Sequence, residues 1–125
     1  MTGYFAQPPL RVRPDATVEA NAANATLTVA NTGKIETNTG AAGAITLTLP
    51  AVAAAAGTGI KVQLTAAQIV NIAPGAATEK IFLGGDGVAN KNLIIAGVVG
   101  NYADLYCDGM SWMVTAYSGV LTKQP

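Results

Sequence analysis

The sequence predicts an all-β protein, a single antiparallel β-sandwich or barrel-like domain with an extended N-terminal arm. Two observations lead to this prediction. Short segments alternate between apolar and polar residues with a period of two, and turn sequences rich in Gly, Asn and Pro separate them. A chain of 125 residues fits one domain, which we place at residues 25–125, with the arm at residues 1–24.

The predicted arm is rich in proline, with Pro8, Pro9 and Pro14 close together. Proline removes a backbone donor and fixes extended geometry. Aromatic side chains are enriched in the cores of interfaces, so we expect the arm to dock on a partner. The candidate contact residues are the apolar anchors Tyr4, Phe5 and Leu10 and the carboxylate-binding Arg11 and Arg13. The alternative is a flexible terminal tail.

The alternation is clearest where Ile45, Leu47 and Leu49 take turns with threonines. Such a segment forms a strand with one apolar and one polar face. The same pattern predicts strands at residues 26–29, 44–50, 59–65, 69–74, 81–85, 103–109 and 112–115. Between two of these strands, Ala51–Ala56 is expected to form one or two helical turns or a loop of small residues.

The last two strands are predicted to form a hairpin, because Asp108-Gly109 is a strong turn signal. Strand alternation places Trp112 on one face with Val114, where a single tryptophan is expected to fill the core or cap its open end. The alternative is an exposed ligand-binding face in which Trp112 or Tyr117 stacks on a sugar.

The charge content of the chain is low and balanced, with seven basic and seven acidic residues, 11% of the total. A neutral chain has no electrostatic footprint for nucleic acid, and no apolar run is long enough for a membrane span. Because obligate interfaces are depleted in charge, we expect much of the surface to be covered by further copies of the chain. The alternative is a compact neutral monomer.

The composition also argues against catalysis. Histidine is absent and Cys107 is the single cysteine, so we expect no enzyme activity, no catalytic residues, no cofactor and no metal site. Nothing in the sequence brings Asp104 to Asp108, or Glu79 to Asp86, at the separation of an acid–base pair. Cys107 is expected to be a buried small apolar residue, and one cysteine fits assembly in a reducing cytoplasm.

The order of segments resembles a β module that is common in tailed-phage virion proteins, in capsid decoration (cement) proteins, head fibres and tail fibres. The resemblance covers residues 33–119, and its most specific part is a Leu-Pro turn combined with an Asp-Gly-x-x-Trp hairpin. The segments that carry it are Asn38–Pro50, Val70–Pro74, Ile81–Gly85 and Leu105–Trp112.

The resemblance implies a structural virion protein, often trimeric and without enzyme activity. Together with the arm and the absence of a fibre repeat, it leads us to expect a homotrimer that binds the major capsid protein and stabilises the shell. Such a protein is made in the host cytoplasm and lies on the capsid surface of the virion. The alternative is a receptor- or glycan-binding tip domain of a phage head or tail fibre.

Overall fold

The computed structural model describes residues 17–125, which form two β-sheets, so the all-β prediction is confirmed. The six-stranded sheet holds, in order, β1 (Val18–Ala20), β3 (Ile35–Thr37), β5 (Gly59–Gln63), β9 (Tyr102–Cys107), β10 (Trp112–Ser118) and β7 (Ile81–Phe82). The five-stranded sheet holds β11 (Leu121–Lys123), β8 (Leu93–Ile95), β6 (Val70–Ala73), β4 (Ile45–Thr48) and β2 (Ala25–Thr26).

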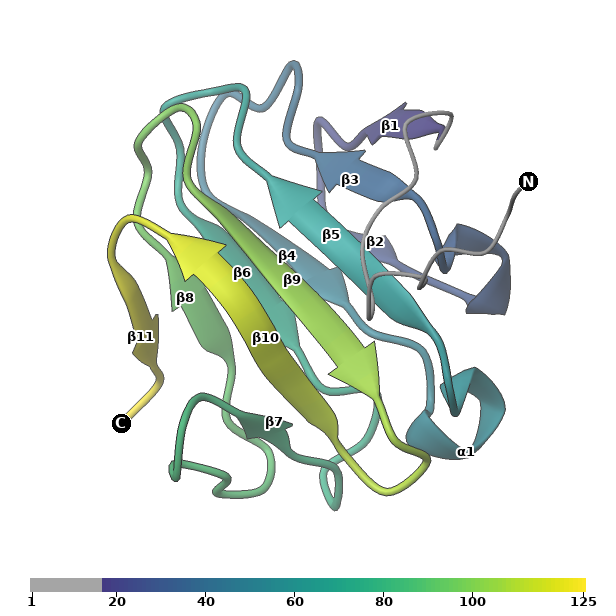
Figure 1. Ribbon diagram of the computed structural model, residues 1–125. Coiled ribbons are helices and arrows are strands. Elements are labelled where there is room, and N and C mark those ends of the chain that lie inside the picture. Colours follow the sequence, from purple (N-terminus) through teal and green to yellow (C-terminus); the bar gives the residue numbers. More distant parts are fainter. Residues whose placement is uncertain (1–16) are drawn as a thin grey trace, which may run out of the picture.

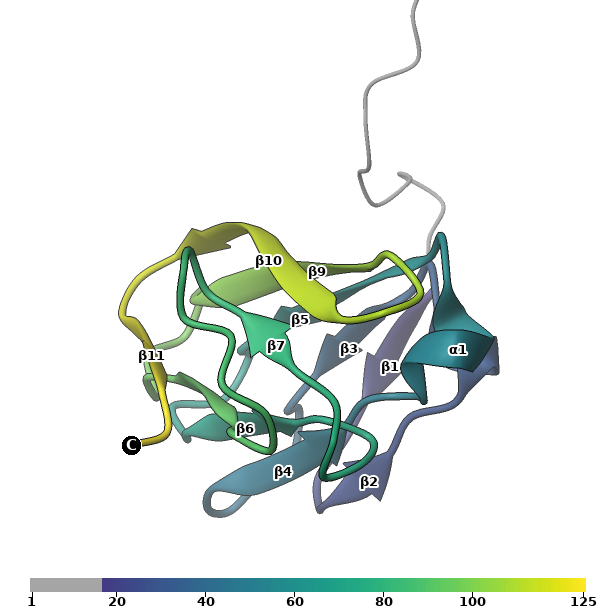
Figure 2. The ribbon, with the colours of Figure 1, turned by 90° about the horizontal axis from the view of Figure 1, so that it is seen from below.

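Figure 1 shows the long β9–β10 hairpin lying across the strands of the second sheet, and Figure 2 shows the two sheets as two layers. At one side of the layers lies the short helix α1 (Val52–Ala55), which confirms the helical turn expected after Pro50. Gly57 follows the helix with a φ of 80°, a left-handed conformation that glycine adopts without strain. Of the strand predicted at 26–29, only Thr26 lies in β2, and Val29 begins a 3₁₀ turn, η1 (Val29–Asn31).

The prediction of antiparallel sheets is wrong, because both sheets are mixed. In the first half of the domain the chain alternates between the layers, so that β1, β3 and β5 join one sheet while β2, β4 and β6 join the other. Strands adjacent in one sheet are therefore one full turn of chain apart and run parallel. We call residues 18–73 the coil, because in this part the chain winds back and forth between the two sheets. From β8 onward, most neighbouring strands are antiparallel.

The coil begins at β1, which pairs with β3 along its three residues. The sheet structure therefore starts at Val18, within the segment that the sequence assigned to the arm (residues 1–24). The arm's candidate residues Tyr4, Phe5, Leu10, Arg11 and Arg13 lie outside the described residues.

The two sheets share a single apolar core. Its members come from the alternate positions that the sequence pattern predicts, such as Ile45 and Leu47 in β4 and Ile60 and Val62 in β5. Trp112 in β10 is fully buried among them, and its indole Nε1 donates to the carbonyl oxygen of Pro50 at 3.2 Å. The expectation that Trp112 belongs to the core is confirmed, and that bond satisfies its one polar group.

A buried asparagine holds a corner of the coil. The Asn38 side chain is fully buried, and its Nδ2 donates to the carbonyls of Ala66 and Gln68 at 3.1 and 3.2 Å. Its Oδ1 accepts from the amides of Thr65 and Ala66 at 2.8 and 2.9 Å. The Asn38 side chain thus makes hydrogen bonds with four backbone groups of residues 65–68, the segment that follows β5.

We predict that Asn38→Ala destabilises the domain by about 3 kcal/mol, because several buried backbone groups lose their partners. Urea denaturation followed by the fluorescence of Trp112 measures the effect. The matched control is Asn24→Ala, which removes one exposed hydrogen bond, from the Thr46 amide, and should cost about 1 kcal/mol or less. Equal urea midpoints for Asn38→Ala and the wild type would contradict the role given to Asn38.

Candidate functional site

In the alternative interpretation of the sequence, Trp112 or Tyr117 stacks on a bound sugar. Trp112 is fully buried, so the alternative in which it stacks on an exposed sugar is wrong. Tyr117, near the end of β10, has 51% of its surface exposed. The next strand, β11, follows directly, and Tyr117 lines neither the hollow beside β7 and β10 nor the one beside β4.

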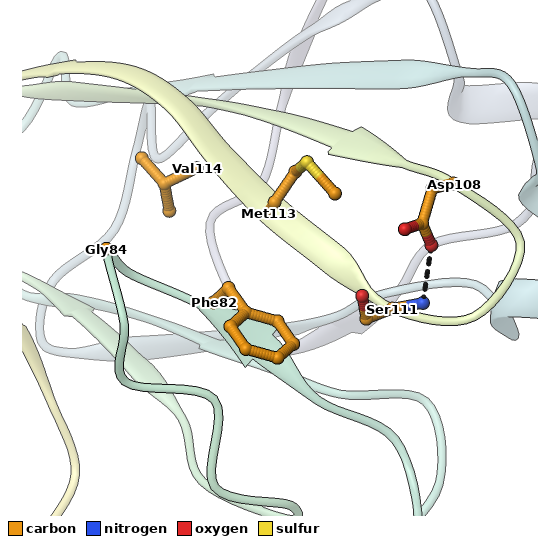
Figure 3. Close-up of a pocket in the computed structure, with 6 residues that line it drawn as sticks. All are labelled: Phe82, Gly84, Asp108, Ser111, Met113 and Val114. Carbon is orange, nitrogen blue, oxygen red and sulfur yellow. Dashed lines mark hydrogen bonds between the residues drawn. The ribbon is translucent and has the colours of Figure 1, made fainter.

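A shallow hollow of about 460 Å³ lies instead beside β7 and β10. Figure 3 shows Phe82 of β7 on one side of it, Met113 and Val114 of β10 on another, and Asp108 and Ser111 at the hairpin turn. Gly87 lies directly against the Phe82 ring, where a Cβ atom would come within 2.1 Å of it. The ring is thereby fixed by the loop after β7.

Asp108 shapes the turn that borders this hollow. Its Oδ1 accepts from the amides of Met110 and Ser111 at 2.9 and 2.8 Å, as expected for an aspartate at the start of a hairpin turn. These two hydrogen bonds lower the pKa of Asp108, so its carboxylate is charged at neutral pH. The hollow therefore combines an apolar floor with one negative edge.

The carboxylate pairs considered from the sequence have separate roles. Asp104 lies 3.9 Å from Lys61 Nζ on the outward side of β9, where burial raises the pKa of Asp104 and Lys61 opposes the change. Glu79 Oε2 accepts from the amide of Val52 at the start of α1. Within residues 17–125, no hydrogen bond joins Asp104 to Asp108 or Glu79 to Asp86.

Two other carboxyls do lie together, and the sequence reasoning missed them. Glu19 in β1 and Glu36 in β3 are register partners at the first turn of the coil. Glu36 is only 1% exposed. A signal was present, because Glu19-Ala20-Asn21 and Glu36-Thr37-Asn38 are the same Glu-x-Asn pattern in successive turns of the coil. The repeat indicates neighbouring glutamates only if the two segments are known to pair in parallel, and the sequence alone does not show that pairing.

Cys107 is buried, as expected, and its Sγ lies 3.3 Å from the carbonyl oxygen of Val52. Burial raises the pKa of the thiol, which disfavours the reactive thiolate. Among the residues that the structure describes, no group of three or more Asp, Glu or Cys side chains is placed to hold a metal ion. None of the helices between residues 17 and 125 is long and apolar enough to cross a membrane.

Comparison with known proteins adds no further assignment, since neither a family model nor a curated protein sequence matches this chain. The functional argument therefore depends on the residues and on their arrangement.

We predict that Trp112 is inaccessible to solutes in the folded protein, because it is fully buried in the core. Acrylamide should quench its fluorescence several-fold less in buffer than in denaturing urea. Since Trp112 is the single tryptophan, the signal has one source. Equal quenching in the two conditions would contradict the burial of the indole.

Proposed function

We propose that this chain is a structural protein that decorates a phage capsid and stabilises it, binding the shell as a homotrimer. In this proposal the two sheets form a β-sandwich. Residues 1–24 provide an extended arm, and β1 is the part of it that pairs with the six-stranded sheet. The partner is the major capsid protein, and the site of action is the outer surface of the virion. The resemblance of residues 33–119 to phage virion modules supports the class of protein.

One observation carries the association between copies, namely the uncharged outer face of the five-stranded sheet. Side chains there alternate with buried ones, so their direction is fixed by the strand period. The outward positions are Thr26, Thr46, Thr48, Asn71, Ala73, Ile94 and Thr122.

The one lysine in this sheet does not belong to that face. Lys123 Nζ donates to the carbonyl oxygens of Ile81 and Lys91, and burial lowers the pKa of Lys123. The outward face that remains is uncharged, and charged residues are likewise depleted in the cores of interfaces between copies. We assign the trimer contact to this face.

The six-stranded sheet has a different outer surface. There Lys61 lies 4.1 Å from the centre of the Tyr102 ring and close to Asp104. A charged and aromatic surface of this kind suits solvent or a second, more polar partner. The contrast between the two faces supports a defined orientation of the domain in an assembly.

Linking three arms in one trimer would strengthen capsid binding through effective concentration. A second and third arm that engage the same shell add avidity, which raises apparent affinity by about 10²- to 10⁴-fold over a single arm. The arm and the trimer face therefore contribute to one function.

We predict that Asn71→Lys, in the middle of the uncharged face, converts the trimer to monomers, because a buried unpaired charge is strongly unfavourable. Sedimentation velocity measures the mass. The matched control is Gln63→Lys on the outward side of the six-stranded sheet, which should leave the trimer intact. A wild-type chain that sediments as a monomer at all concentrations would contradict the trimer.

We predict that deletion of residues 1–15 leaves a folded oligomer that no longer binds capsids, because β1 and the whole coil remain. Co-sedimentation with purified capsids measures binding, and circular dichroism checks the fold. A milder variant, Tyr4→Ala with Phe5→Ala, should weaken binding at least 10-fold if these side chains are the anchors. Normal binding by the truncated protein would refute the role of the arm.

The hollow beside Phe82 favours a second candidate function, a glycan- or receptor-binding tip of a head or tail fibre. It offers an aromatic ring and a carboxylate, two groups that saccharide sites commonly use. If that function holds, Phe82→Ala should abolish glycan binding while Tyr117→Ala preserves it, as measured by glycan array. Labelling the protein on intact virions separates the two functions, because it shows decoration of either the head or a fibre.

A further inference from the structure

Two carboxyl groups lie side by side inside the first turn of the coil. Glu19 on the edge strand β1 is the register partner of Glu36 on β3, which in turn is the register partner of Val62 on β5. Val62 is fully buried in the core, and Glu36 is 1% exposed. Because register partners point to the same side of a sheet, both carboxyls lie on its inner side, where Glu36 is buried and the Glu19 side chain remains 30% exposed.

The hydrogen-bond donors around the pair are one too few for two carboxylates. Glu19 Oε1 accepts from Asn31 Nδ2 at 2.7 Å, and its Oε2 accepts from Lys34 Nζ at 3.1 Å. Glu36 Oε1 accepts from Asn21 Nδ2 at 3.0 Å. Glu36 Oε2 is buried and accepts no hydrogen bond from the described residues.

A single proton on Glu36 would correct this imbalance. A protonated carboxyl is a donor as well as an acceptor, so Glu36 could donate to Glu19, which keeps its negative charge beside Lys34. A second ionised carboxylate in this place would instead be buried without an opposite charge of its own, which is strongly unfavourable.

We propose that Glu19 and Glu36 share one proton and that this proton fastens the edge strand β1 to β3, so that β1 detaches when the proton is lost. The shared proton thus keeps β1, the first strand of the coil, paired with β3. The proposal does not depend on the function assigned to the protein, since β1 and β3 are paired strands of the six-stranded sheet.

The electrostatics agree with this arrangement. A hydrogen bond donated by protonated Glu36, with that from Asn31, lowers the pKa of Glu19 to about 2. Burial, with the hydrogen bond to Glu19, raises the pKa of Glu36 to about 7. The charged group facing the pair from the β3 side is Lys34, while Lys61 of β5 lies on the opposite face of the sheet near Asp104.

The direction of the pH dependence follows from these two values. An ordinary glutamate has a pKa of 4.5, so between pH 4.5 and 7 the folded protein holds a proton on Glu36 that the unfolded chain releases. Stability is therefore lost as the pH rises from 4.5 to 7. Glu19 acts in the opposite sense, because its stabilisation is lost as the pH falls from 4.5 towards 2. Docking of β1 should be strongest near pH 4.5.

The proposal is tested by hydrogen exchange of backbone amides in the full chain. The reporters are the amides of Ile35, bonded to Thr17, and of Asn21, bonded to Thr37, because these bonds link β3 to the residues on either side of β1. After correction for intrinsic exchange, their opening constants should rise on the order of 10- to 100-fold from pH 5 to pH 8. The amide of Leu64, bonded to Asn101, is the internal control and should not change comparably.

Glu36→Gln supplies the decisive variant. A glutamine amide is neutral at every pH and can donate to Glu19 as the protonated acid does, so β1 should stay docked at pH 8. The matched variant Glu19→Gln removes the charge that keeps the proton on Glu36, so the transition should move to lower pH. If Glu36→Gln did not fold, the carboxyl ¹³C shift of Glu36 in the wild type would still report its titration.

Three outcomes would overturn the proposal. The first is an unchanged opening constant for β1 between pH 5 and pH 8. The second is titration of both glutamates near their ordinary pKa of 4.5. The third is the same loss of β1 protection between pH 5 and pH 8 in Glu36→Gln, because that variant has no carboxyl at this position to titrate.

Discussion

The structure depends on the way the chain turns from one sheet to the other. Six successive strands change layers, and each change must satisfy backbone groups that leave a sheet near the core. Asn38 meets this requirement at one corner with four hydrogen bonds to residues 65, 66 and 68. Thr39 and Thr65 continue the contact with a 2.6 Å bond between their hydroxyls. Once the corners are fixed, parallel pairing and the shared core follow.

The sequence predicted which residues lie in strands much better than it predicted which strands are neighbours. Alternation identified β4, β5, β6, β9 and β10, because each has one face in the core and one outside. It missed β8, whose Leu93-Ile94-Ile95 has no polar position, and the edge strand β1, which has no large core residue. It also missed the three-residue strands β3 and β11. Pairing direction is a property of the path between strands, and no local pattern records that path.

The same limit applies to the candidate sites. The burial of Cys107 and the turn role of Asp108 were predictable, because each depends on its own strand or turn. The hollow beside Phe82 was not, because it brings together β7 and β10, which are parallel neighbours far apart in the sequence. The Glu19–Glu36 pair joins two turns of the coil in the same way, and only the repeated Glu-x-Asn spacing hinted at it.

Polar groups at the first turn of the coil also explain why the core ends there. A stack of parallel strands can bury its last apolar face only with a partner or a polar cap. Inward-pointing charge on an edge strand also discourages further strands from adding to the sheet. Glu19 on β1 both caps the apolar face and discourages a further strand, but its register partner Glu36 is then buried beside a second carboxyl. The proton that neutralises Glu36 is therefore a consequence of how this coil is closed, and the pH sensitivity of β1 follows from the same closure.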